Sequence, residues 1–119
     1  MLQMVVDSRE LVEQACRSIR ADPWLAPALG MARHTARDSL KNALTLLVGG
    51  TLARRAEHAV AGFIAYLGPR GLTNDEYDRL AHYVLSAALA RRVGPERLIL
   101  IGAALTTVRM ALLPGTCRR

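Results

Sequence analysis

Aromatic side chains are scarce in this sequence, at 4% of its 119 residues. They are Trp24, Phe63, Tyr66, Tyr77 and Tyr83. Apolar residues nevertheless make up 51% of the chain, so aliphatic and alanine side chains must fill the core of a globular domain. This composition excludes a disordered tail, and the length suits one domain. We therefore expect a single helical domain that spans residues 1–119.

Lysine is nearly absent, although the chain is basic. Of its 16 basic residues only Lys41 is a lysine, and against 10 acidic residues the net charge is +6. Arginine suits carboxylate and phosphate partners because its planar guanidinium donates several hydrogen bonds. A GC-rich coding sequence would produce the same bias without a functional cause. The charge favours an acidic protein, a nucleic acid or an anionic membrane as partner.

Cysteine is also rare, with only Cys16 and Cys117. Two cysteines are too few for the disulfide framework of a small secreted domain. The first residues lack the basic region and the long apolar run of a signal peptide. We expect two reduced thiols in a cytoplasmic protein.

The alternation of apolar and polar residues that marks strands is absent, whereas apolar residues recur at helical spacing. The sequence therefore predicts an all-α fold, a compact bundle of about five helices. We expect these helices at about residues 8–21, 31–48, 51–67, 74–92 and 95–113, with a single helical turn between residues 23 and 30.

Local signals set most of these boundaries. Asp7 and Ser8 are typical of a helix start. Pro23 disfavours a helical backbone at Asp22, the residue before it, so the first helix is expected to end there. Gly49-Gly50 predicts a turn, because two glycines cost about 2 kcal/mol inside a helix relative to alanine.

The second half of the chain carries clearer signals. Thr73 and Glu76 have the spacing of a capping box, in which each side chain binds the other's backbone amide. Gly94 is expected to cap the end of that helix, and Pro95 suits the first turn of the next.

The last segment, Leu98–Leu113, is apolar almost all round. Its 16 residues fall short of the roughly 20 that span a membrane, and Arg109 lies among them. A helix that is apolar on all sides is typical of a bundle centre, where we expect this one to lie. The alternative that a second copy of the chain covers part of it stays open.

Catalytic patterns are missing. His34, His58 and His82 are evenly spaced, but none has a partner at metal-ligand spacing. The carboxylates considered for acid–base chemistry mostly suit helix caps or solvated faces: Glu57, Asp75, Glu76, Asp78 and Glu96. The sequence has no nucleophile elbow, no phosphate-binding loop and no Cys-x-x-Cys pair. We expect no enzyme activity, no catalytic residue, no metal and no cofactor.

One segment resembles a nucleic-acid-binding motif. Residues 90–94, Ala-Arg-Arg-Val-Gly, resemble a helix-turn-helix junction, which implies DNA binding through the helix that follows. That helix, however, offers Leu98, Ile99 and Leu100 where polar side chains must reach base edges. The remaining nucleic-acid hypothesis uses phosphate contacts from Arg91, Arg92 and Arg97.

These observations favour binding over catalysis. We expect a non-enzymatic module that docks on another macromolecule, as a regulator, adaptor or inhibitor of a larger assembly. Its partner is expected to be a protein, with nucleic acid as the alternative, no membrane span, and self-association left open. The expected contacts are a face with four-residue spacing and two residues near the glycine pair: Arg33, Arg37 and Lys41, then Arg54 and Arg55.

Overall fold

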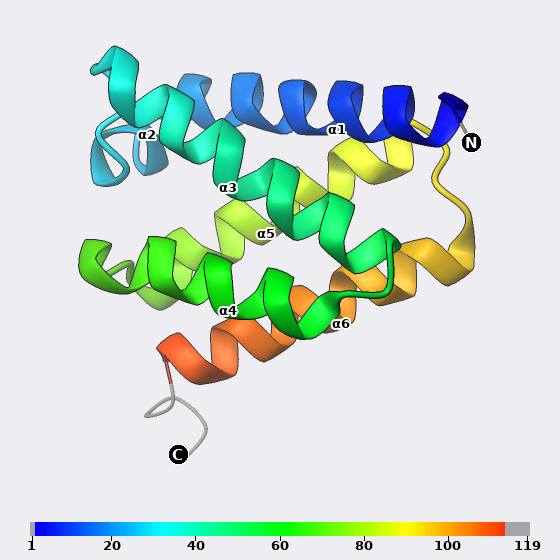
Figure 1. Cartoon of the computed structure of the whole chain (residues 1–119). Coiled ribbons are helices and arrows are strands. Elements are labelled where there is room, and N and C mark those ends of the chain that lie inside the picture. Colours follow the sequence, from blue (N-terminus) through cyan, green and yellow to red (C-terminus); the bar gives the residue numbers. More distant parts are fainter. Residues whose placement is uncertain (1, 114–119) are drawn as a thin grey trace.

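The computed structural model describes residues 2–113, with side chains from Arg9 onward, and within this range it is helical without a strand (Figure 1). The elements are α1 (Leu2–Ala21), α2 (Leu25–Ala28), α3 (His34–Leu52), α4 (Ala56–Leu67), the 3₁₀ turn η1 (Gly68–Arg70), α5 (Asn74–Ala90) and α6 (Pro95–Leu112). The prediction of an all-α bundle is confirmed. The described part holds six α-helices rather than about five, because the connector turn forms α2.

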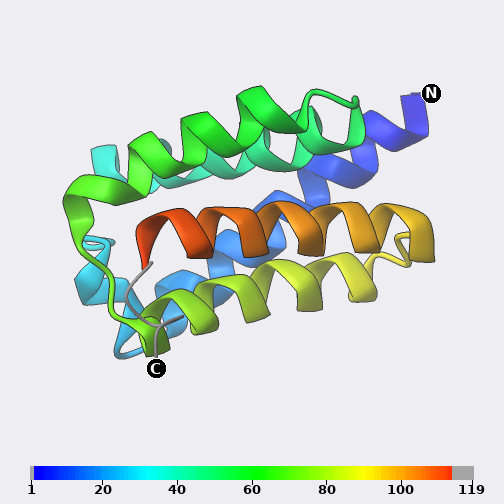
Figure 2. The ribbon, with the colours of Figure 1, turned by 90° about the horizontal axis from the view of Figure 1, so that it is seen from below.

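The five long helices form a ring of neighbours around one core. Helix α1 contacts α3, α3 contacts α4, and α4 contacts α6. Helix α6 in turn contacts α5, and α5 contacts α1, which closes the ring; α3 also contacts α6. Seen from below, α6 runs between α4 and α5 (Figure 2). The short α2 contacts α1 and α5. Among the described residues, the fully buried core is aliphatic except for Phe63 and Tyr77, as the composition predicted.

The expected helix start near residue 8 is wrong. Helix α1 begins at Leu2 and runs through Asp7 and Ser8. A capping signal is local, and neither glycine nor proline precedes it to stop the helix. The other end agrees with the prediction, since α1 ends at Ala21, two residues before Pro23.

The predicted turn at Gly49-Gly50 is also wrong, because both glycines lie inside α3. A Cβ atom built on Gly50 would lie 2.9 Å from the Cβ of Ala59 in α4, so glycine lets the two helices approach closely. The break comes at Ala53–Arg55, where Arg54 adopts a left-handed conformation with φ 62°. Two separate helices therefore meet at a close contact.

The signals around α5 are mostly confirmed. The Thr73 hydroxyl accepts from the Glu76 amide at 3.2 Å, and the Thr73 amide donates to the Glu76 carboxylate at 2.9 Å, which completes the capping box. Pro95 occupies the first turn of α6. Gly94 is not the left-handed cap of α5, because Arg92 takes that conformation with φ 59° and Gly94 is extended.

The expectation that α6 lies at the centre is not confirmed. It buries Ile101, Leu105 and Val108 against neighbouring helices, but Ile99 is 69% exposed and Met110 57% exposed. The apolar character of α6 therefore exceeds what its own chain covers. Within residues 2–113, none of the helices has the length and hydropathy that a membrane crossing needs.

A buried carboxylate ties three helices together. The Asp22 side chain accepts hydrogen bonds from the backbone amides of Trp24 and Leu25, both at 2.8 Å, from Arg79 at 2.9 Å and from the Tyr83 hydroxyl. Burial raises the pKa of Asp22, but these hydrogen bonds outweigh it, so the pKa lies well below its usual range. Asp22 thus joins the end of α1 to α2 and α5.

Candidate functional site

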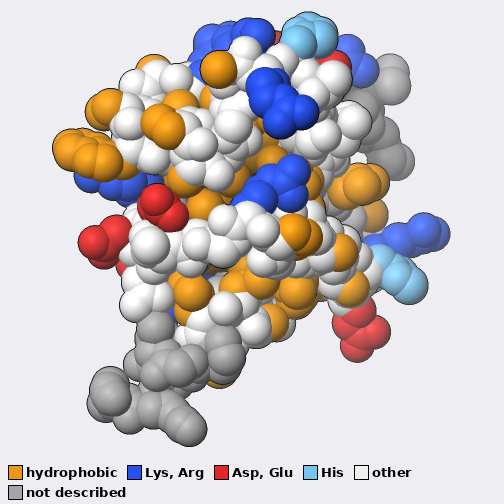
Figure 3. All heavy atoms as spheres, turned by 90° about the vertical axis from the view of Figure 1, so that its left-hand side faces the viewer, with side chains coloured by type: hydrophobic (Ala, Val, Ile, Leu, Met, Phe, Trp, Pro, Cys, Tyr) orange, Lys and Arg blue, Asp and Glu red, His pale blue; other side chains and the backbone are white. Residues whose placement is uncertain are grey.

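A groove of about 290 Å³ lies between α1 and the first turns of α3. Its lining residues are Glu13, Cys16, Arg17, Arg20, Met31, His34, Arg37, Asp38, Leu40 and Lys41. Figure 3 views the molecule from the left-hand side of Figure 1 and shows Lys and Arg side chains concentrated in its upper half, where α1 and α3 lie. Basic side chains of α1 and α3 meet in this groove.

Four cationic side chains line the groove, two from each helix: Arg17, Arg20, Arg37 and Lys41. Two carboxylates lie among them. The Lys41 Nζ lies 3.4 Å from the Glu13 Oε2, and the His34 Nε2 lies 3.6 Å from the Asp38 Oδ2. All four of these side chains are well exposed, so each contact contributes little to stability. The lining keeps an excess of positive charge.

Three of the cationic side chains show no partner among the described residues. The guanidinium groups of Arg17, Arg20 and Arg37 form no ion pair or hydrogen bond within the part of the chain that the structure describes. Arg37 is half-buried, and its Nε is shielded from solvent without an acceptor. Unpaired guanidiniums that meet at one hollow offer hydrogen-bond donors to an anionic group, because each has several donors in a fixed geometry.

The floor of the groove is apolar. Met31 and Leu40 are buried, and Cys16 is half-buried beside them. Burial raises the pKa of the Cys16 thiol to about 11, although Lys41 and Arg20 act in the opposite direction. A cationic rim over an apolar floor suits a ligand that carries both carboxylates and apolar groups.

Alkylation of Cys16 should report this environment. Because only the thiolate reacts, the rate in a Cys117→Ser variant should rise about tenfold per pH unit from pH 7 to about pH 10. The urea-unfolded chain is the control, and its rate should level off near pH 9. A plateau near pH 9 in the folded protein would contradict the raised pKa. Cys117 itself lies outside the described residues.

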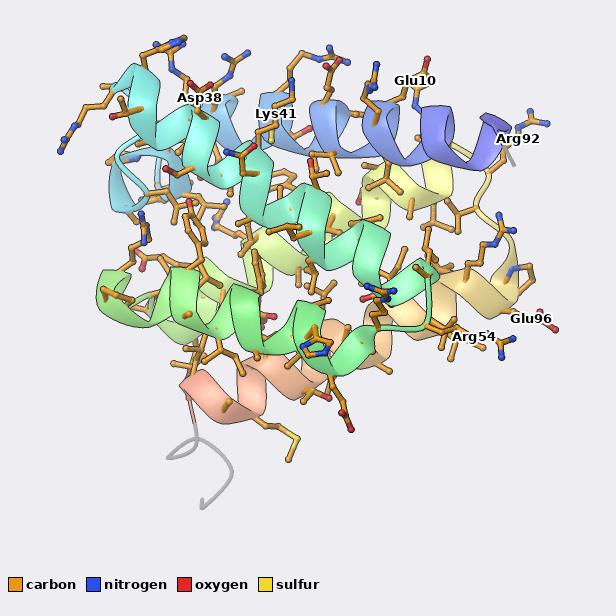
Figure 4. The ribbon with its side chains drawn as sticks, viewed as in Figure 1. Glu10, Asp38, Lys41, Arg54, Arg92 and Glu96 are labelled. Carbon is orange, nitrogen blue, oxygen red and sulfur yellow. The ribbon has the colours of Figure 1, made fainter. Side chains whose placement is uncertain are left out.

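The predicted partner face is divided by the structure. Arg37 and Lys41 line the groove, and Arg33 lies exposed just before α3. Arg54 and Arg55 follow the other end of α3, about 25 Å along the helix axis from Arg37. Figure 4 shows Lys41 and Arg54 far apart along α3. The structure therefore does not bring the two halves of this face together.

Arg17 and Arg20 were not among the predicted contacts. Sequence spacing places both on the polar side of the first helix, which is the signal that could have found them. That signal is weak by itself, because most polar faces are solvated. The packing of α1 against α3 turns these residues into half of a groove.

The alternative phosphate contacts lie at the junction of α5 and α6. Arg91 donates to the Glu10 carboxylate at 2.9 Å and to Gln14 at 3.3 Å, so it is engaged with α1. Arg92 is exposed in its left-handed conformation, and Arg97 is exposed in the first turn of α6. A phosphate at Arg91 would have to compete with the ion pair.

The histidines lie on three different helices. His34 lies on α3, His58 on α4 and His82 on α5, and all three are exposed. Over residues 9–113, whose side chains the structure describes, His, Cys, Asp and Glu form no group of three that could hold a metal ion. His82 instead lies 3.4 Å from the Ser86 hydroxyl.

Comparison of the chain with protein-family models, curated proteins and solved structures finds no match.

Proposed function

We propose that the chain is a non-enzymatic binding module that docks on an acidic segment of another protein, as a regulator or adaptor of a larger assembly. The observation that supports it is the meeting of unpaired Arg17, Arg20 and Arg37 above an apolar floor. The proposed ligand is a short stretch of chain in which Asp or Glu alternates with apolar residues.

The groove favours a peptide over a nucleic-acid backbone. Its volume of about 290 Å³ matches a few side chains, at the lower end of ligand sites, whereas a duplex needs a long charged surface. Glu13 and Asp38 on the rim would repel closely spaced phosphates. Met31 and Leu40 line the floor and would contact apolar groups of a ligand, which a phosphate backbone lacks.

The experiment compares two defined probes by fluorescence polarisation: a labelled peptide of alternating Glu and Leu, and a labelled DNA duplex. We expect the peptide to bind, and the double substitution Arg17→Glu/Arg37→Glu to weaken binding by at least about 100-fold, since the two lost charged hydrogen bonds together cost roughly 3–6 kcal/mol. Arg55→Glu, an exposed charge reversal beyond the far end of α3, is the matched control and should change affinity less than about twofold.

A second readout locates the peptide. Because Cys16 lines the groove, bound peptide should slow its alkylation in proportion to occupancy. The proposal is wrong if the duplex binds more tightly than the peptide with a steep salt dependence. It is also wrong if Arg55→Glu weakens binding as much as the groove variant, or if saturating peptide leaves the rate at Cys16 unchanged.

A further inference from the structure

The outward side of α6 carries an exposed stripe of three apolar residues and one threonine. Ile99, Ala103, Thr106 and Met110 are all exposed and follow one another at intervals of four, three and four residues. This spacing places them on one face of the helix, opposite the buried Ile101, so they form a single line. We call these four residues the α6 stripe.

We propose that the α6 stripe binds a second copy of this chain, with the two α6 helices antiparallel across a two-fold axis. The stripe is symmetric about the midpoint of residues 104 and 105. In the antiparallel pair Ile99 therefore faces the partner's Met110, and Ala103 faces the partner's Thr106. Small side chains meet at the centre, where the helices approach, and large ones close both ends.

The charge distribution supports a second copy as the occupant. Each chain carries +6, so two copies repel unless they meet where charge is absent. No charged residue lies between Arg97 and Arg109, and the Arg109 Nε lies 2.9 Å from the Asp78 Oδ1 of its own chain. Two chains that meet at the α6 stripe therefore bring no like charges together at the centre of the contact.

The available area suits a weak dimer. Helix α6 has 18 residues and is about 27 Å long, and the helices on either side of it extend the face to about 20 Å in width. Such a face offers about 550 Å² per copy, at the lower end of specific interfaces. Beside the stripe, Leu100 is 44% exposed and adds apolar contact. We expect a dissociation constant in the micromolar range. The inference is independent of the α1/α3 groove.

Sedimentation velocity from about 1 to 300 µM tests the dimer. The wild-type chain should shift from monomer to dimer over this range. Ala103→Glu places two charges at the centre of the pair, so this variant should dimerise at least tenfold more weakly. Asn42→Glu adds the same charge to an exposed position of α3 and should dimerise like wild type. Circular dichroism of both variants checks that they stay folded.

Disulfide trapping tests the orientation. In a background without Cys16 and Cys117, a mixture of Ala103→Cys and Thr106→Cys chains should crosslink mainly as the mixed dimer, since these positions face each other only in the antiparallel pair. A chain that stays monomeric at 300 µM would overturn the proposal. An Ala103→Glu variant that dimerises like wild type, or crosslinking of each variant mainly with itself, would do so as well.

Discussion

Replacing Asp22 with alanine should lower the free energy of unfolding by about 3–5 kcal/mol. The carboxylate is buried and accepts from two backbone amides, Arg79 and Tyr83, so its removal leaves the Leu25 amide and the Tyr83 hydroxyl without a partner. Because a domain is typically stable by only about 5–15 kcal/mol, this loss is a large part of the total. Urea denaturation at pH 7 measures it.

Asp22→Asn is the matched control, because it keeps the shape of the side chain and an acceptor for the α2 amides. We expect it to cost about half as much as alanine at pH 7. A loss for Asp22→Ala below about 1 kcal/mol would show that the carboxylate does not hold the three helices together.

The same pair of proteins gives a pH dependence. The folded-state pKa of Asp22 lies below its unfolded value of about 3.9, so the ionised carboxylate stabilises the fold above that value. This contribution is lost as the pH falls below about 4. The stability difference between wild type and Asp22→Asn should therefore be constant from pH 7 to about pH 5 and shrink below pH 4. A constant difference down to pH 2 would contradict the lowered pKa.

The second large effect is expected at the glycine pair of α3, where the two neighbours should respond with opposite signs. Gly49→Ala should stabilise the protein by up to about 1 kcal/mol, because an added Cβ meets nothing within 4 Å and alanine is the better helix former. Gly50→Ala should destabilise it by about 1–3 kcal/mol, because its Cβ would lie 2.9 Å from that of Ala59.

A double substitution checks the cause. In Gly50→Ala/Ala59→Gly the crowded Cβ atom on α4 is gone, so stability should recover to within about 1 kcal/mol of wild type. Thermal and urea unfolding of the single and double variants measure the coupling. Equal effects of alanine at both glycines would show that α3 and α4 do not meet closely at Gly50.

Several boundaries of this fold follow from local chemistry, although the local signals at Asp7-Ser8 and Gly94 do not. Pro23, the Thr73–Glu76 capping box and Pro95 act within one or two turns, and each stands where it was expected. The prediction of a turn at Gly50 was wrong because the glycine is needed for close packing against Ala59, which belongs to another helix. A glycine that permits close packing and a glycine that makes a turn look the same along the chain.

Two of the residues that line the groove, Arg37 and Lys41, also belong to the predicted partner face. Arg37 and Lys41 follow from their spacing on one helix, whereas Arg17 and Arg20 belong to a helix whose neighbour the sequence does not specify. The expected addition of Arg54 and Arg55 depended on a turn at the glycine pair. Since α3 continues to Leu52, those residues are carried to its far end.

The groove is lined by α1, which lies at the top of the bundle, whereas α6 lies at the bottom, so the groove and the α6 stripe belong to opposite sides of the molecule (Figure 1). Two chains paired through α6 would leave both grooves open and facing outward. Such a pair would be bivalent and could bind two acidic segments, on two partner molecules or on one. Tethering of this kind raises the apparent affinity by about 10²–10⁴ without any new contact, so two grooves that each bind weakly could together bind one partner tightly.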